Sequence, residues 1–312
     1  MAGLPSQTTF FIENMMSPLA YSKSMPKTSP QVENSAIPVQ KLIEVGREAA
    51  FLAGDYLKQQ YDQLCEKDIS EKAQNDFVTY VDTASEKIII DHILESFPGH
   101  SILSEESEAI DAGGAYRWII DPLDGTRNYI QKIPFFAVSI AVTENKQPVA
   151  GVVLDVAHGE LFHAMRGKGA FLNDEPIEVS KRTEIRNAVI GTGFPHRRKE
   201  TLRRYLSAFE EIFRNCSGMR RIGAAALDLC YVACGRLEGF FELGLSPWDV
   251  AAGALIAGEA GGSVTDFWGQ AGYLNSGYVV AGNPAIHSEL TTILAKLFEQ
   301  PKETSVNNKG IA

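Results

Sequence analysis

The stretch WIIDPLDGTRNY, residues 118–129, places two aspartates after an apolar run of the kind that forms a buried strand. Asp121 and Asp124 are followed by Gly125 and Thr126, residues typical of a turn or a helix start. Two like charges at the end of a buried strand destabilise a fold unless positive charge lies beside them. The rest of the sequence must therefore supply basic side chains or bind cations at this point.

The bulk composition favours an acidic globular protein of one large domain or two ordinary ones. The 312 residues are 45% hydrophobic and carry a net charge of -10. This charge favours bound cations and argues against nucleic acid or a membrane surface as partner. No apolar stretch approaches the roughly 20 residues of a membrane span. Four cysteines without a CxxC pair argue against zinc and favour a cytoplasmic location.

The two ends of the chain differ in composition from its middle. Residues 1–37 are rich in Ser, Thr and Pro and lack the pattern of a signal peptide, so a disordered extension is predicted. Residues 301–312 are predicted to form a disordered tail. Between them we expect an N-terminal α+β half with the metal site, residues 38–182. A C-terminal α/β half, residues 183–300, is expected to complete the substrate site.

The residue pattern within these halves mixes helices and strands. Helical periodicity runs from Val39 to about Tyr61, and a second helix is expected to begin near Thr83 as N-cap. Residues 135–179 alternate between apolar runs and turn residues and are predicted to be an antiparallel meander. Because no regular βαβ repeat appears, layered sheets and helices are favoured.

Elsewhere in the chain, carboxylates also lie at the ends of predicted strands or at the start of a predicted helix. Glu105 and Glu106 follow a short strand, Asp82 ends FVTYVD, and Asp249 opens the helix PWDVAAGALIAGE. If these ends converge with Asp121 and Asp124, only divalent cations stabilise the cluster, and an oxygen-only set favours Mg²⁺ or Mn²⁺. Backbone N–H groups at a helix start after Asp124 would suit a phosphate. Spacing alone does not show that the segments meet, since Asp-Pro and Asp-Gly also form ordinary turns.

Several of these motifs resemble those of the inositol monophosphatase family. WIIDPLDGTRNY resembles its first signature, and PWDVAAGALIAGEAGG resembles its second. HSILSEES and NDFVTYVD resemble two further family segments, and residues 220–249 are similar to bacterial inositol-1-monophosphatases. The resemblance covers about residues 39–298. It implies an α+β fold, a layered αβαβα sandwich of the type shared with fructose-1,6-bisphosphatase.

The resemblance also implies an Mg²⁺-dependent, lithium-sensitive phosphomonoesterase that hydrolyses myo-inositol 1-phosphate or a similar polyol or sugar phosphate. It implies a homodimer and two or three Mg²⁺ per site. The first two would be held by Glu105, Asp121, the Leu123 carbonyl, Asp124 and Asp249, and the third would lie near Glu105 and Glu106. Implied catalytic residues are Asp82, Thr126 and Glu105. The Gly125 and Thr126 N–H groups would bind phosphate. Substrate hydroxyls would contact Asp124, Gly223, Ala224, Ala225, Glu242 and Asp249.

Two places leave alternatives open. Arg127 stands where most relatives have Thr; we expect it to point to solvent or a neighbouring loop, and the alternative is that it adds positive charge beside the phosphate. GFPHRRKE, residues 193–200, is basic; we favour a solvated helix start over a site for a second phosphate, and we expect His196 not to be catalytic. The alternative activities are fructose-1,6-bisphosphatase and 3′-phosphoadenosine nucleotidase. The remaining alternative is a catalytically idle regulatory protein of the same fold.

Overall fold

The computed structural model describes residues 38–64, 69–73 and 76–300, and the structural statements below concern these residues. The segments predicted to be disordered, residues 1–37 and 301–312, lie outside them. Within the described residues, no helix has the length and apolar character that crossing a bilayer takes.

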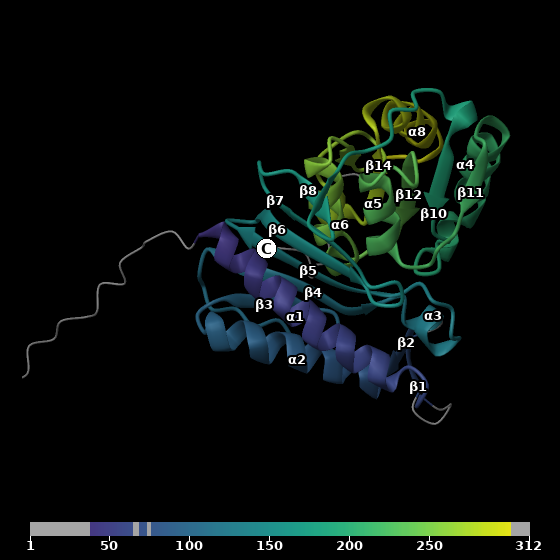
Figure 1. Cartoon of the computed structure of the whole chain (residues 1–312). Helices are drawn as coiled ribbons and strands as arrows, with labels where there is room; N and C mark the ends of the chain where they lie inside the picture. The colour runs from purple at the N-terminus through teal and green to yellow at the C-terminus, as the bar shows by residue number, and fades with distance from the viewer. Residues whose placement is uncertain (1–37, 65–68, 74–75, 301–312) are drawn as a thin grey trace, which may run out of the picture. The chain divides into compact units, whose positions relative to one another are not determined.

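A seven-stranded sheet forms the first strand layer (Figure 1). Its strands pair in chain order, antiparallel except for the first pair, so the meander predicted for residues 135–179 is confirmed. The strands are β3 (Ser101–Ser104), β4 (Tyr116–Asp124), β5 (Ala137–Glu144), β6 (Gln147–Asp155), β7 (Glu160–Met165), β8 (Ala170–Leu172) and β9 (Glu175–Ile177).

A five-stranded sheet forms the second strand layer, with the order β11-β10-β12-β14-β13. β10 runs parallel to both of its neighbours, and the other pairs are antiparallel. The strands are β10 (Val189–Thr192), β11 (Gly218–Arg220), β12 (Gly239–Leu243), β13 (Ser263–Thr265) and β14 (Tyr278–Gly282). A separate hairpin joins β1 (Ile69–Ala73) to β2 (Asp76–Thr79).

Helices cover and separate the two sheets, which gives the predicted αβαβα sandwich (Figure 1). α1 and α2 cover the outer face of the large sheet, α5 and α6 lie between the sheets, and α4 and α8 cover the small sheet. The helices are α1 (Val39–Gln60), α2 (Tyr80–Ser96), α3 (Thr126–Ile130), α4 (Leu202–Asn215), α5 (Ala225–Ala233), α6 (Pro247–Glu259), α7 (Tyr273–Ser276) and α8 (Pro284–Leu297), with 3₁₀ turns η2 (Ile185–Asn187) and η3 (Lys199–Thr201).

The packing on both faces of the large sheet explains why the sequence of β4 before Asp121 is a continuous apolar run. Trp118 packs with the α1 and α2 side chains on one face of the sheet, and the next residue, Ile119, packs with α5 and α6 on the other. Successive side chains of a strand point to opposite faces, so a strand between two helix layers is apolar throughout. Burying each of these side chains stabilises the fold by about 1.5–3 kcal/mol.

The start of α2 differs from the expected one. Thr79 is the N-cap: its hydroxyl oxygen accepts a hydrogen bond from the Val81 N–H, and the Asp82 carboxylate accepts one from the Thr79 N–H. This reciprocal capping box begins the helix at Tyr80. The N-cap expected at Thr83 is therefore wrong, and Asp82 lies in the first turn of a helix rather than at the end of an extended segment.

Candidate active site

A cavity of about 200 Å³ lies where the two sheets and the helices between them meet. It gathers most of the residues singled out from the sequence, although they come from segments more than 140 residues apart. Asp82, Glu106 and Ala224 do not line it, and Asp82 reaches it through Thr126. The predicted residues that line the cavity are Glu105, Asp121, Leu123, Asp124, Gly125, Thr126, Gly223, Ala225, Glu242 and Asp249.

An irregularity at the end of β4 turns both of its aspartates toward this cavity. Asp121 pairs with Ser139 and Asp124 with Ala137, so three steps along β4 match two along β5. In a regular strand, side chains three residues apart face opposite sides. The extra residue of this bulge restores the same side. The Leu123 N–H donates to Asp121 Oδ1 at 3.0 Å, which satisfies one backbone group inside the bulge.

Four carboxylates converge on the cavity floor. Asp121 is almost fully buried, and burial together with neighbouring Glu105, Asp124 and Asp249 raises its pKa well above the usual range. Burial, and then the charge of Asp249, raises the pKa of Asp124 to about 7, although the Ala226 N–H donates to Asp124 Oδ2 at 2.8 Å. This concentration of buried negative charge is unfavourable unless a cation balances it.

Asp249 is held by the start of α6. Ser246 is the N-cap, and its N–H donates to Asp249 Oδ2 at 2.7 Å in a second capping box. Pro247 occupies the first helical turn, where its missing N–H costs no hydrogen bond. The same short sequence that begins the helix therefore also aims a carboxylate into the cavity.

Thr126 lies between two oxygen atoms of the cavity wall. Its hydroxyl oxygen is 3.0 Å from Asp82 Oδ1 and 3.0 Å from the Leu123 carbonyl oxygen. The other carboxylate oxygen of Asp82 accepts from the Thr79 N–H and hydroxyl at 2.8 and 2.7 Å. Burial nevertheless raises the pKa of Asp82. A buried acid beside a hydroxyl is suited to accept a proton from a nucleophile.

The turn between β4 and α3 requires glycine. Gly125 has φ 87°, and a Cβ there would lie 2.8 Å from the Phe135 carbonyl oxygen. Asn128 holds the turn in place, because its side-chain N–H₂ donates to the Phe135 and Ile222 carbonyls at 2.7 and 2.9 Å. The bond to Ile222 joins α3 to the segment just before α5, so it fixes the two sides of the cavity relative to each other.

The side chain of Glu242, near the end of β12, packs against Gly193, which follows the neighbouring strand β10. A Cβ at Gly193 would overlap the Glu242 carboxylate, so the glycine leaves the space that this side chain occupies. Burial raises the pKa of Glu242 to about 8, which the nearby Arg221 partly offsets. Asp228 of α5, likewise buried and with a strongly raised pKa, carries an Oδ1 atom with no hydrogen-bond partner. The sequence offered no signal for Asp228, which sits in an apolar helical pattern.

Arg197 reaches the cavity floor from the basic stretch after β10. Its guanidinium lies 3.4 Å from Asp249 Oδ2, 3.7 Å from Glu105 Oε1 and 3.3 Å from the Ser246 hydroxyl. In the part of the chain that the structure describes, no group of three or more His, Cys, Asp or Glu side chains is arranged to hold a metal ion. Arg197 thus supplies positive charge to two of the carboxylates in this arrangement.

Three further basic residues lie at the cavity rim. Arg127, His196 and Arg221 line it together with Arg197. The expectation that GFPHRRKE forms only a solvated helix start is therefore wrong for His196 and Arg197, because the loop folds toward the cavity before η3 begins. Arg127 is exposed, as expected, but it also lines the rim.

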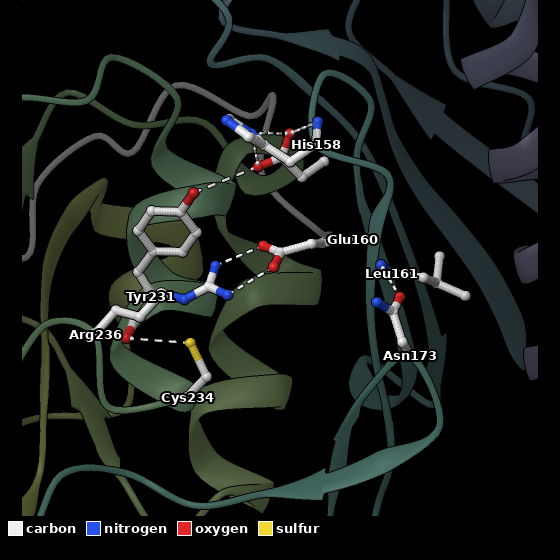
Figure 2. A network of polar contacts seen from close by, with 8 residues as sticks. His158, Glu160, Leu161, Asn173, Tyr231, Cys234 and Arg236 are labelled. Atoms are coloured by element: carbon white, nitrogen blue, oxygen red, sulfur yellow. Dashed lines mark hydrogen bonds and ion pairs between the residues drawn. The ribbon is translucent and has the colours of Figure 1, made fainter.

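A polar network away from the cavity joins the large sheet to the end of α5 (Figure 2). Arg236 makes two parallel hydrogen bonds with Glu160 of β7, at 2.5 and 2.6 Å, and lies over the ring of Tyr231. The Tyr231 hydroxyl donates to buried Asp155, which also accepts from the His158 backbone N–H. None of these residues lines the cavity.

Comparisons with known proteins identify the family of this chain. Residues 39–303 match the model of the family described as "Inositol monophosphatase family". The chain belongs to the inositol monophosphatase family. Its similarity to the Nus factor SuhB of Escherichia coli (strain K12) is 44% identity over 246 residues, covering 78% of this chain and 92% of that protein.

Solved structures of family members share the fold. The extragenic suppressor protein suhB of Bartonella henselae has a TM-score of 0.78 and 42% identity, over 82% of this chain and 99% of its own. The inositol monophosphatase of Anabaena (Nostoc) sp. PCC 7120 has a TM-score of 0.75 and 39% identity, over 83% and 97%. The Anabaena relative is thus named for a phosphatase activity, whereas SuhB of Escherichia coli is named as a Nus factor.

The donor set suits a hard divalent cation by its chemistry, although the described side chains are not arranged as a metal site. The cavity floor offers carboxylate oxygens and the Leu123 carbonyl, which are the ligands that Mg²⁺ prefers. The raised pKa of Asp121, caused by burial and three neighbouring acids, shows how strongly the floor lacks positive charge. Arg197 lies 3.7 Å from Glu105 and 3.4 Å from Asp249. Its charge also lowers the pKa of Asp124, but less than burial and Asp249 raise that pKa.

Proposed function

We propose that this protein is an Mg²⁺-dependent phosphomonoesterase that hydrolyses myo-inositol 1-phosphate or a similar polyol phosphate. The observation that carries the proposal is the meeting of four carboxylates and the Asp82–Thr126 pair at one cavity. The carboxylates suit metal ions, and the pair suits proton transfer from a water molecule. The family, and the Anabaena relative named as an inositol monophosphatase, support the reaction class and the choice of substrate.

In this proposal the floor carboxylates hold the metal and Asp82 takes the proton. When bound, Mg²⁺ makes water more acidic and neutralises charge that develops on the phosphoryl and leaving oxygens. The residues that would hold it are Glu105, Asp121, Leu123 through its carbonyl, Asp124 and Asp249. Thr126 would pass the proton of the attacking water to Asp82, because its hydroxyl already lies 3.0 Å from Asp82 Oδ1. Glu105 would add charge beside the attacking water.

The substrate would be held from both sides of the cavity. The Gly125 and Thr126 N–H groups would bind phosphate oxygens at the floor. The ring hydroxyls would face the acids Asp124, Glu242 and Asp249 and the turn Gly223, Ala224 and Ala225. Glu242 suits this role because burial raises its pKa to about 8, so that near neutral pH its carboxyl can donate as well as accept a hydrogen bond.

The test is phosphate release across a panel of sugar and polyol phosphates, with and without Mg²⁺ and with and without lithium. We expect Mg²⁺-dependent release from myo-inositol 1-phosphate and inhibition by lithium. Asp124→Asn should abolish release while the chain stays folded, because Asn keeps an acceptor for the Ala226 N–H but removes the charge. Activity that survives this change would contradict the metal assignment.

A second candidate function is a regulatory protein that retains the fold without catalysis. It is supported by the name of the Escherichia coli relative, Nus factor SuhB. Wild-type protein that releases no phosphate from any panel member would favour it. Fructose-1,6-bisphosphatase and 3′-phosphoadenosine nucleotidase activities are decided by the same panel. The homodimer, the cytoplasmic location and the absence of a nucleic-acid partner stay predictions.

A further inference from the structure

One face of α2 carries three buried polar side chains. Asp82, Ser85 and Glu86 are three residues and then one residue apart, so they lie on the same side of the helix. Their exposed fractions are 1%, 0% and 4%. Asp82 belongs to the proposed proton-transfer pair, whereas Ser85 and Glu86 do not line the cavity. Because a buried hydroxyl or carboxylate is costly without hydrogen-bond partners, the partners of these two side chains show what they hold in place.

Glu86 holds the turn that follows β3. Its Oε2 atom accepts a hydrogen bond from the Glu106 N–H at 2.8 Å and another from the Ser104 hydroxyl. These two donors belong to the residues on either side of Glu105. β3 is a four-residue strand at the edge of the large sheet, so the sheet itself holds this strand end from one side only. The carboxylate of Glu86 therefore fixes the backbone that carries Glu105.

Ser85 holds the neighbouring strand end. Its hydroxyl donates to the Pro122 carbonyl at 2.9 Å, inside the bulge of β4. The parallel register of β3 and β4 brings Glu105 beside Asp121. Burial and then the charge of Glu105 raise the pKa of Asp121, so the two carboxylates lie close enough to repel each other. Consecutive residues of one helix thus hold two strand ends whose acids repel.

The repulsion between these carboxylates opposes the arrangement that a shared cation requires. Apolar residues of α2, such as Ile89 and Ile93, pack in the core, but apolar contacts have no direction and do not fix a backbone turn. Hydrogen bonds to a carboxylate have direction and are about twice as strong as neutral ones. Glu86 and Ser85 therefore supply the directional contacts that keep the two strand ends at a fixed separation.

We propose that Glu86, supported by Ser85, is a positioning residue that holds Glu105 and Asp121 where they can share one divalent cation. The inference rests on the proposed function, because this cation is the Mg²⁺ assigned there to the floor carboxylates. It deepens that function by naming residues outside the cavity on which metal affinity depends. One face of α2 then carries the proton acceptor, Asp82, together with the two side chains that order the metal floor.

Mg²⁺ affinity measures this role without turnover. Calorimetric titration of the full-length protein with Mg²⁺ gives the dissociation constant, and the rise in unfolding temperature on adding Mg²⁺ is the second readout. Glu86→Ala removes the acceptor and should raise the dissociation constant about ten- to a hundredfold, as loss of a partner behind a metal ligand does. Ser85→Ala removes one neutral hydrogen bond and should raise it about three- to tenfold.

A conservative variant separates position from charge. Glu86→Gln keeps an oxygen acceptor at the same reach but removes the negative charge. If the hydrogen bonds to Oε2 matter, Glu86→Gln should stay within about threefold of the wild-type dissociation constant. Asp91→Asn is the matched control, since it removes a carboxylate from an exposed pair with Lys87 on the same helix and should leave Mg²⁺ binding unchanged.

Thermal unfolding without Mg²⁺ checks that each variant folds. Wild-type affinity in Glu86→Ala would overturn the inference, and so would a Glu86→Gln variant that binds Mg²⁺ as weakly as Glu86→Ala. If Glu86→Ala does not fold, an unchanged dissociation constant in Ser85→Ala overturns it instead. Wild-type protein that binds no Mg²⁺ would overturn both this inference and the proposed function. Absent phosphate release from wild-type protein that does bind Mg²⁺ would overturn the proposed function alone.

Discussion

The hydroxyl oxygen of Thr126 lies 3.0 Å from Oδ1 of Asp82, although 44 residues separate them in the sequence. The contact joins the first turn of α2 to the first residue of α3, and the Asp82 carboxylate is fixed from its other side by Thr79. A proton acceptor and a hydroxyl are therefore in place before any substrate binds.

Replacing Thr126 tests this relationship directly. Thr126→Val removes the hydroxyl but keeps the shape, so kcat for phosphate release should fall about a hundredfold or more, the usual contribution of a positioned proton-transfer group. Thr126→Ser keeps the hydroxyl and should retain most of the activity. Steady-state kinetics, with thermal unfolding as the check on folding, measure both. A valine variant that works as well as the serine variant would remove Thr126 from the mechanism.

Arg197 is expected to compete with metal binding. Its guanidinium is 3.4 Å from Asp249 and 3.7 Å from Glu105, so a cation that takes both carboxylates must displace it. Arg197→Ala should tighten Mg²⁺ binding about three- to tenfold, as expected for a partly exposed ion pair. Calorimetric titration with Mg²⁺ measures the change, and Arg203→Ala is the charge-matched control. Weaker Mg²⁺ binding in Arg197→Ala would show that Arg197 supports the site rather than competing for it.

Gly193 is expected to be needed for the position of Glu242. Because an added Cβ would overlap the Glu242 carboxylate, Gly193→Ala should displace that side chain. KM for a polyol phosphate should rise about tenfold, with a smaller change in kcat, as loss of a hydrogen bond to a substrate hydroxyl implies.

A second glycine supplies the matched control for this change. Gly258 lies near the end of α6 with no atom within 4 Å of an added Cβ, so Gly258→Ala should stabilise the fold by about 0.5–1 kcal/mol without changing KM. Thermal unfolding measures the stability of the two variants, and steady-state kinetics measure their KM. An unchanged KM in Gly193→Ala would argue against Glu242 as a substrate contact.

We expect the Glu160–Arg236 pair to contribute to the free energy of unfolding in a way that depends on pH. Its hydrogen bonds lower the pKa of Glu160. The contribution is therefore complete above the ordinary glutamate pKa and is lost as the pH falls through the lower folded value. Glu160→Gln should reduce the free energy of unfolding by about 1 kcal/mol at neutral pH, a figure held down because Arg236 is 39% exposed.

Urea denaturation at neutral pH and at about pH 3, below the ordinary glutamate pKa, measures this difference. It should be smaller at the lower pH, because the contribution declines as the pH falls below the ordinary glutamate pKa toward the lowered folded value. Glu210→Gln is the control, since Glu210 forms an exposed pair with Arg214 on α4 and should change stability little at either pH. A cost for Glu160→Gln that is the same at both pH values would contradict the assignment to charge.

Local patterns predicted much of the fold and the individual carboxylates of the cavity floor, whereas the meeting of these carboxylates at one site was implied only by the family resemblance. The apolar run before Asp121 becomes β4, and the PWD motif begins α6 with Asp249 facing the cavity. The start of α2 was missed because Thr79 and Thr83 are both acceptable caps, and the return bond from Asp82 decides between them. Local spacing cannot show such a reciprocal contact.

The rim could not be predicted for a different reason. Arg127, His196 and Arg221 are far apart in the sequence, and each is an ordinary exposed residue by its local pattern. Only the approach of α3, the β10 loop and the segment before α5 brings them to one opening. Asp228 was missed likewise, since its apolar neighbours indicate a core helix and give no sign of the acids that face it.

The bulge at the end of β4 makes the DPLD motif sensitive to chain length in a way that substitution does not reveal. Pro122 and Leu123 contribute side chains that other residues can replace, but their number creates the bulge. Deleting one of them would leave the two aspartates two residues apart in regular register with β5, on one face as before. It would nevertheless remove the bulge, and with it the Leu123 N–H that donates to Asp121 and the Leu123 carbonyl that accepts from the Thr126 hydroxyl. Within this family, therefore, insertions and deletions between the two aspartates should be excluded even where the intervening residues vary.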